Sequence, residues 1–195
     1  MYPLFATSFL YGAFSYLIGS IPTGYLITRF FAGIDVRLHG SGNIGATNVS
    51  RLLGKKFFFL VLLLDACKSF AVLRFVQSQT TSEHIIMFCA LAVLLGNCYS
   101  IFLCGDGGKG GATLFGITCA VSSLLGIYFF AVWFFVYITS KINAVATLVA
   151  SCSVPLVAWY FDLYPLLFLC ASILVCVRHK DNIRQLYNNY TSSCI

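Results

Sequence analysis

The chain contains 195 residues, of which 59% are hydrophobic and 9% are charged, and its formal net charge is +6. A soluble domain carries charge on about a quarter of its residues, so this composition excludes an ordinary water-soluble globule. The excess of Lys and Arg suits cytoplasmic loops, which accumulate these residues, or the binding of anionic headgroups and substrates. No dense basic run with interleaved aromatic residues occurs, so we expect no nucleic-acid partner.

Three apolar runs in the first half of the chain are candidates for membrane spans, since a spanning helix needs about 20 largely apolar residues. They cover residues 4–27, 57–76 and 85–103, and we expect the first to be retained rather than removed as a signal peptide. Gly19, Pro22 and Gly24 interrupt the first run, which is tolerated where a helix lines protein or a cavity. The loop 32–56 is basic, whereas the link 77–84 has no Lys or Arg. Because basic loops stay inside, we expect this loop in the cytoplasm and the amino terminus outside.

The second half of the chain decides the number of spans. The apolar stretch 112–140 is too long for one comfortable crossing, and Ser122, Ser123 and Gly126 break it. Two crossings there, followed by the apolar runs 144–159 and 166–177, keep every basic cluster on the cytoplasmic side. The sequence therefore predicts an all-α, polytopic integral membrane bundle of about seven transmembrane helices, with six as the alternative and the carboxyl terminus in the cytoplasm. We expect residues 1–195 to form a single membrane-embedded domain.

Two kinds of polar residue lie within the apolar runs. Asp65 and Lys68 stand three residues apart and share one helix face. They are either a functional site, as intramembrane charges often are, or a self-neutralising pair that faces the bundle interior. The cysteines form no C-x-x-C pair and no Cys/His cluster at zinc spacing, so we expect packing residues and no metal site.

The first polar loop carries a glycine-rich segment from Gly40 to Arg51. Its glycines let the backbone approach a ligand, and successive amides in such turns form an anion-binding concavity. Thr47 and Asn48 are good helix-start residues, and a helix amino terminus attracts phosphate. Ser41 offers a hydroxyl, and Arg51 offers a planar fork suited to bidentate phosphate contact. A flexible linker is the alternative, but a linker has no need of this set of side chains.

The second polar segment, from Gly105 to Gly111, opens the next apolar run. It combines bare backbone amides with Lys109, and Thr113 follows at a helix start, which favours a phosphate cradle over a mobile turn. In the third segment, His179 and Asn182 are three residues apart and point the same way on a helix. The flanking Arg178, Lys180 and Arg184 are explained equally well as a basic membrane anchor.

All three segments fall on the predicted cytoplasmic side, so they predict one anion site at the membrane interface. The implied substrate carries a phosphate group. Because the site lies beside lipid-accessible helices, we expect one substrate or product to be lipid-like.

These segments resemble, in order and spacing, the motifs of the acyl-phosphate-dependent glycerol-3-phosphate acyltransferase family of bacterial inner membranes. The resemblance begins at Gly19-Ser20-Ile21-Pro22 and continues through the segment 40–51. It includes Gly107-Gly108-Lys109-Gly110 with Ala112-Thr113 and Gly116, and then His179 with Asn182-Ile183. It runs over nearly the whole chain.

The resemblance implies an acyltransferase that moves the acyl chain of an acyl phosphate to the 1-hydroxyl of glycerol 3-phosphate. The products would be lysophosphatidic acid and inorganic phosphate, in the first acylation step of phospholipid synthesis. It also implies a multi-pass protein of the bacterial inner membrane, with its active site at the cytoplasmic face and membrane lipids as neighbours. No metal or cofactor is implied, and the oligomeric state stays open.

The family's functional residues carry over onto matching positions of this chain. The implied catalytic residues are Ser41, Arg51, Lys109, His179 and Asn182. The implied substrate and phosphate contacts are Gly40, Gly42, Asn43, Gly45, Thr47, Asn48, Gly107, Gly108, Gly110 and Thr113. His179 is either the general base or a group that positions the hydroxyl while a substrate phosphate oxygen takes the proton.

The chain departs from the family pattern at several positions. Asn97 stands where the family usually has His, and Ser100 where it has Pro. Ala144 replaces a Ser, with Asn143 and Thr147 as candidate substitutes, and a late Glu is missing. The rival hypothesis from another class is a transporter or channel for a phosphorylated solute, whose site would lie near the bilayer midplane between internal repeats. We find no such repeat.

Overall fold

The described chain is a bundle of α-helices without a strand between residues 2 and 192, as the computed structural model shows. Residues 1 and 193–195, which the predicted domain includes, lie outside the described residues. The α-helices are α1 (Tyr2–Ser20), α2 (Thr23–Ala32), α3 (Ala46–Leu53), α4 (Lys55–Gln79), α5 (Glu83–Cys98), α6 (Gly111–Val121), α7 (Ser123–Ser140), α8 (Asn143–Tyr160), α9 (Pro165–Arg178) and α10 (Lys180–Ser192). Two short 3₁₀ helices, η1 (Val36–Leu38) and η2 (Ile101–Leu103), lie in the loops. The all-α prediction is confirmed.

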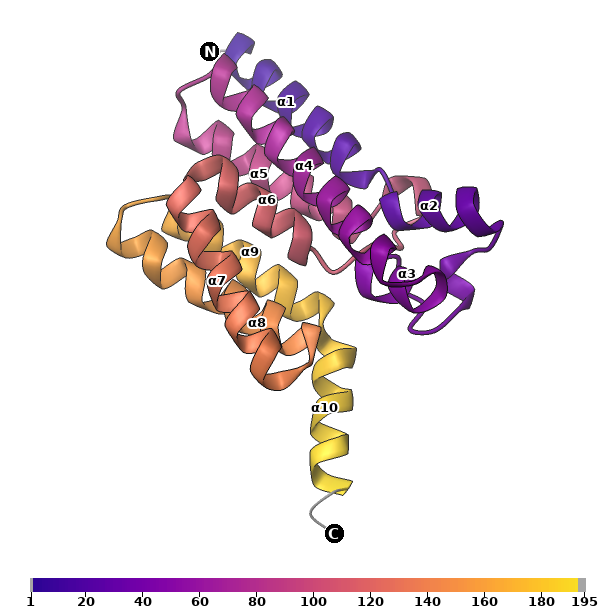
Figure 1. The fold of residues 1–195 in the computed structure, drawn as a ribbon. Coiled ribbons are helices and arrows are strands. Elements are labelled where there is room, and N and C mark those ends of the chain that lie inside the picture. The colour runs from indigo at the N-terminus through magenta and orange to yellow at the C-terminus, as the bar shows by residue number, and fades with distance from the viewer. Residues whose placement is uncertain (1, 193–195) are drawn as a thin grey trace.

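The long helices pack in pairs around one core (Figure 1). Helix α1 packs against α5, α4 against α6, and α8 lies between α7 and α9. Helices α2 and α3 lie together at one end of the bundle, and α10 extends away from it (Figure 1). Helix α6 links the amino-terminal helices to the carboxyl-terminal ones, because it contacts α4 and α5 as well as α7 and α8.

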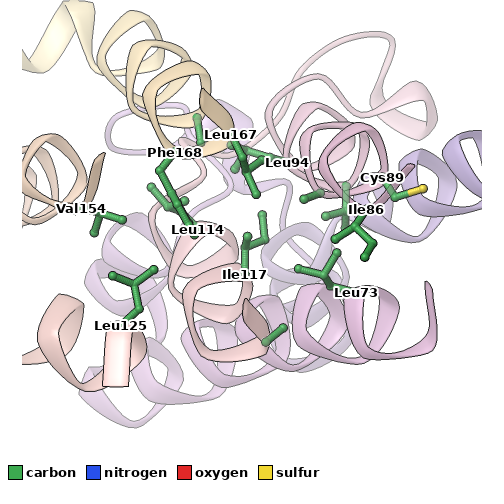
Figure 2. Close-up of a cluster of buried hydrophobic side chains, with 14 of the residues drawn as sticks. Leu73, Ile86, Cys89, Leu94, Leu114, Ile117, Leu125, Val154, Leu167 and Phe168 are labelled. Carbon is green, nitrogen blue, oxygen red and sulfur yellow. The ribbon is translucent and has the colours of Figure 1, made fainter. Parts of the chain in front are cut away.

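The core lies where these pairs meet, and its largest side chains come from helices far apart in the sequence. Leu73, Leu94, Leu114, Ile117 and Phe168 are all completely buried there (Figure 2). The outer faces of the bundle are apolar too, because most helices expose large hydrophobic side chains. An apolar surface of this extent requires lipid rather than water around the bundle.

Three helical stretches within the described residues are long and apolar enough to cross a membrane. They are Glu83–Leu103, Ser123–Ser140 and Asn143–Tyr160, and the apolar helices α6 and α9 are shorter. The predicted break of the stretch 112–140 is confirmed, since α6 ends at Val121 and α7 begins at Ser123.

One predicted run and one predicted loop differ from expectation in the structure. The first run divides at Ile21–Pro22 into α1 and α2, because proline lacks the amide hydrogen and disfavours helix in the residue before it. The predicted loop 32–56 contains a helix of its own, α3, which begins at Ala46 within a residue of the expected start. A smaller apolar cluster that includes Ile27, Val36 and Val49 holds this region together.

Close packing between helices depends on small residues. A side chain at Gly116 of α6 would place its Cβ 2.1 Å from the Ala66 carbonyl oxygen of α4. The Ser69 hydroxyl donates across the same interface to the Thr113 carbonyl at 2.9 Å. Small residues and hydrogen-bonded hydroxyls of this kind are what hold helices together in lipid.

We predict that Gly116→Ala lowers the stability of the protein by about 1–3 kcal/mol, because the added methyl group forces α4 and α6 apart. Thermal unfolding in detergent measures this change. Leu63→Ala, on the exposed side of α4, is the control. An unchanged unfolding midpoint for Gly116→Ala would show that the two helices are not in such close contact.

Candidate active site

A cavity of about 960 Å³ opens between α3, α4, α6, α7, α8 and the junction of α9 with α10. This volume is at the upper end of the range typical of small-molecule sites. Ser41, Arg51, Lys109, His179 and Asn182, predicted from three separate segments, all line it. The structure therefore brings the five predicted catalytic residues to one place.

Asn48 organises the first loop from within. Its side chain is buried, its Oδ1 accepts a hydrogen bond from the Ser41 amide at 3.1 Å, and its Nδ2 donates to the carbonyls of His39 and Asn43 at 2.9 Å. Gly40 has a φ of +59°, and a Cβ there would lie 2.3 Å from Asn48 Oδ1. These contacts hold Ser41 at the cavity wall.

Helix α3 presents one face to the cavity. Thr47 and Arg51 are four residues apart, so they lie on the same face and both line the cavity. Thr47 Oγ1 accepts a hydrogen bond from Asn143 Nδ2 at 2.8 Å, and Asn143 Oδ1 accepts one from Trp133 Nε1 at 3.0 Å. These bonds join α3 to α7 and α8. No hydrogen bond or ion pair links Arg51 to another of the described residues, so its guanidinium is available to a ligand.

The second loop is held through its carbonyl oxygens. Arg178 donates from Nε to Gly108 O and from NH2 to Gly107 O, both at 3.1 Å, and its guanidinium lies over the Tyr99 ring. Asn43 Nδ2 also donates to Gly107 O, at 3.0 Å. Arg178 therefore does more than anchor the chain at the membrane, because it fixes the backbone of the loop that carries Lys109.

Lys109 and Asn182, from two different segments, form a hydrogen-bonded pair in the cavity lining. Lys109 Nζ donates to Asn182 Oδ1. An ammonium group can only donate, so it fixes the amide with Oδ1 toward Lys109 and Nδ2 turned away. The cations Arg178 and Arg51 line the same cavity and repel the Lys109 ammonium group. A bound anion would relieve this repulsion between cations.

His179 is 5% exposed and caps α9. Its Nδ1 lies 2.8 Å from the Val175 carbonyl oxygen. Because a carbonyl only accepts, Nδ1 carries the hydrogen, and Nε2 of the neutral ring is a free acceptor. Burial lowers the pKa of His179; the bond to Val175 opposes this, and Lys109 and Arg178 lower the pKa further. The neutral ring is therefore favoured at neutral pH.

Not every predicted contact residue reaches the cavity with a free polar group. Gly40 and Thr113 do not line it, and Thr113 is fully buried against α4. Asn43 and Asn48 do line it, but both amide atoms of each already bond to backbone groups. In these two residues the amide is needed to shape the loop.

The cavity has an excess of positive charge. Its lining cations are Arg37, Arg51, Lys109, Lys141, Arg178 and Lys180, and its lining carboxylates are Asp65, Asp106 and Asp181. Two of these carboxylates are paired: Asp65 with Lys68 at 2.7 Å, and Asp106 with Arg37 at 3.5 Å. Arg37 also pairs with Asp35 at 2.8 Å, and its hydrogen bonds lower the pKa of Asp35 to about 2. The remaining charges favour a ligand with a multiply charged anionic group.

Part of the cavity lining is aromatic. On α7 the rings of Phe130, Trp133 and Tyr137 stack in sequence, with centroids 6.0 Å and 5.2 Å apart. Phe58 of α4 and Phe115 of α6 also line the cavity. A lining that combines cations with aromatic rings suits an amphiphile with an anionic head and an apolar tail.

Known proteins match the chain over most of its length. The family model described as Glycerol-3-phosphate acyltransferase matches residues 9–189. A glycerol-3-phosphate acyltransferase of Pelagibacter ubique is 37% identical, covering 89% of this chain and 91% of that protein. Two solved structures of PlsY, an integral membrane glycerol 3-phosphate acyltransferase, also match. The glycerol 3-phosphate form has a TM-score of 0.88 and 34% identity, and the lysophosphatidic acid form has 0.87 and 33%; each comparison covers 94% of this chain and 93% of that one.

We predict that His179 makes the protein less stable in mild acid. Because its pKa is lower in the folded state, the unfolded chain takes up the proton first as the pH falls below about 6.5. Stability contributed by neutral His179 is therefore complete above that pH and is lost below it. His179→Gln should flatten the pH dependence of the unfolding midpoint in this window.

The same substitution at exposed His84 is the control for the loss of an imidazole elsewhere. If His179→Gln and the unsubstituted protein lose stability in parallel on acidification, the imidazole is not held neutral by burial.

Proposed function

This chain belongs to the glycerol-3-phosphate acyltransferase family and is an acyltransferase, and on that premise we propose that it transfers the acyl chain of an acyl phosphate to the 1-hydroxyl of glycerol 3-phosphate. The products are lysophosphatidic acid and inorganic phosphate. The observation that carries the proposal is a single cavity whose lining combines cations that have no carboxylate partner with stacked aromatic rings. Both substrates contain phosphate, and only the donor has a long apolar chain.

Cations and polar groups of the cavity lining hold the phosphate groups in this proposal. Arg51 provides a bidentate fork, Lys109 a half-buried charge, and Ser41 a hydroxyl. Asn182 directs Nδ2 away from Lys109 and can donate to the same anion. The acyl chain lies along the aromatic rings, where its burial contributes about 0.8 kcal/mol per methylene group.

The reaction requires positioning more than a new reactive group, because an acyl phosphate is already activated. The hydroxyl oxygen of glycerol 3-phosphate attacks the acyl carbonyl carbon, and the bond from that carbon to the phosphate oxygen breaks. Neutral His179 accepts a hydrogen bond from the hydroxyl at Nε2, and the proton leaves on the released phosphate. Lys109 and Arg51 stabilise the charge that develops on the phosphate. Fixing both substrates in one cavity contributes the rest of the rate enhancement.

We further propose a topology for this integral membrane protein. Helix α1 and the six helices from α4 to α9 are the seven crossings, and α2, α3 and α10 lie at the cytoplasmic face. The basic residues of the first loop and of the chain after α9 support this orientation. In this topology a single acyltransferase domain lies in a bacterial inner membrane, with its cavity open to the cytoplasm.

We predict that the purified protein releases inorganic phosphate from an acyl phosphate only when glycerol 3-phosphate is present. Lys109→Ala should lower the rate at least about a hundredfold, since it removes a half-buried charge that acts on the transferring group. Lysophosphatidic acid measured by mass spectrometry should match the released phosphate mole for mole.

Lys55→Ala is the matched control, because Lys55 is exposed at the start of α4 and does not line the cavity. It should keep the full rate. Phosphate release that does not depend on glycerol 3-phosphate would contradict the proposal. So would flux of glycerol 3-phosphate into proteoliposomes without acyl transfer.

A further inference from the structure

Asn97 lies at the end of α5 and is hydrogen-bonded to the Asp65–Lys68 ion pair of α4. It is 6% exposed and lines the cavity. Its Oδ1 accepts a hydrogen bond from Lys68 Nζ at 2.9 Å. Lys68 also donates to the Ile21 carbonyl at 2.9 Å and pairs with Asp65 at 2.7 Å. Asp65 in turn accepts from the Thr23 hydroxyl at 2.7 Å.

These contacts fix which way the Asn97 amide points. An ammonium group has three donors and no acceptor, so the amide oxygen must face Lys68 and the amide nitrogen must face away. The three partners of Lys68 are the Ile21 carbonyl, Asp65 and Asn97, so its hydrogen-bonding capacity is complete. A rotation of the amide would place two donors against each other.

The Asn97 amide nitrogen points toward the glycine loop. A Cβ added at Gly108 would lie 3.0 Å from Asn97 Nδ2, so the absence of a side chain there leaves the nitrogen uncovered. The Asn97 backbone oxygen accepts from the Gly108 amide at 2.8 Å, which holds the loop beside it. Among the described residues, none accepts a hydrogen bond from this nitrogen.

Polar groups of largely buried side chains are usually hydrogen-bonded in native proteins, and because Asn97 lines the cavity, a partner for its amide nitrogen can come from there. This donor lies beside Gly108, the residue that precedes Lys109, in a cavity lined by several cations. The ligand group should therefore accept a hydrogen bond from Asn97 Nδ2 and carry negative charge among these cations. An oxygen atom of a phosphate group does both.

We propose that Asn97 is a further substrate-binding residue, whose Nδ2 donates a hydrogen bond to a phosphate oxygen of the bound substrate. Lys68, neutralised by Asp65, is the positioning residue that holds the amide in this orientation. This inference rests on the proposed function, since it takes its phosphate from glycerol 3-phosphate or from the acyl phosphate. The sequence left open whether Asp65 and Lys68 are a functional site or a self-neutralising pair inside the bundle. In this proposal they are both.

The test is Asn97→Asp, which keeps the shape and an oxygen facing Lys68 but replaces the donor with an anionic oxygen. Losing a hydrogen bond to a charged group should raise KM by about ten- to a hundredfold for the substrate whose phosphate is contacted. KM is measured for each substrate with the other saturating. Isothermal titration with glycerol 3-phosphate gives Kd directly and needs no turnover.

Two further variants keep the test open if the aspartate destabilises the fold. Gly108→Ala places a methyl group over the Asn97 nitrogen and should raise the same KM. The double variant Asp65→Asn/Lys68→Met removes both charges together, so no carboxylate is left unpaired, and frees the amide to rotate. Lys55→Met, on the exposed start of the same helix, is the matched control.

A selective rise in one KM, with the unfolding midpoint retained, supports the proposal and identifies the phosphate. A higher KM for glycerol 3-phosphate assigns the contact to the acceptor, and a higher KM for the acyl phosphate assigns it to the donor. Unchanged KM values for both substrates in Asn97→Asp, or a loss of kcat alone, would overturn it. An unsubstituted protein that transfers no acyl group would instead sink the proposed function, so the two failures are distinct.

Discussion

The carbonyl oxygens of Gly107 and Gly108 are the point on which the rest of the site depends. Arg178, from the end of α9, and Asn43, from the first loop, donate to these oxygens, so segments some 70 and 64 residues away along the chain fix one short stretch of backbone. With its carbonyls held this way, the loop presents Lys109 to the cavity. Without Arg178 and Asn43 the two carbonyls would have no partner among the described residues, and the glycines would leave the backbone free to move.

The membrane makes this constraint stricter. Helix α6 has 11 residues, which is about 16 Å at the helical rise and well short of a hydrocarbon core of about 30 Å. In the proposed topology the glycine loop therefore completes the crossing and lies below the membrane surface. Irregular backbone is tolerated at such depth only where protein groups satisfy it. The contacts of Arg178 and Asn43 that shape the site thus also satisfy the backbone that follows from so short a helix.

The sequence predicted the helical class, the break near Ser122 and the gathering of Ser41, Arg51, Lys109, His179 and Asn182, because periodicity, charge bias and motif spacing carry that information. It could not separate residues that face a ligand from residues that hold the loop. Asn48 and Arg178 look like phosphate ligands or anchors by type, yet both bond to backbone. Thr113 looked like a helix-start ligand, yet the close approach of α4 buries it. Asn97 carried no local signal, since its orientation comes from Lys68 on another helix.

A crystal structure of this protein with glycerol 3-phosphate tests the central claim most directly. The account predicts its phosphate group inside the cavity, within hydrogen-bond distance of side chains from at least two of the three separate segments, with Arg51 or Lys109 among them. A phosphate held only by exposed cations outside the cavity, such as Arg184 of α10, would contradict it.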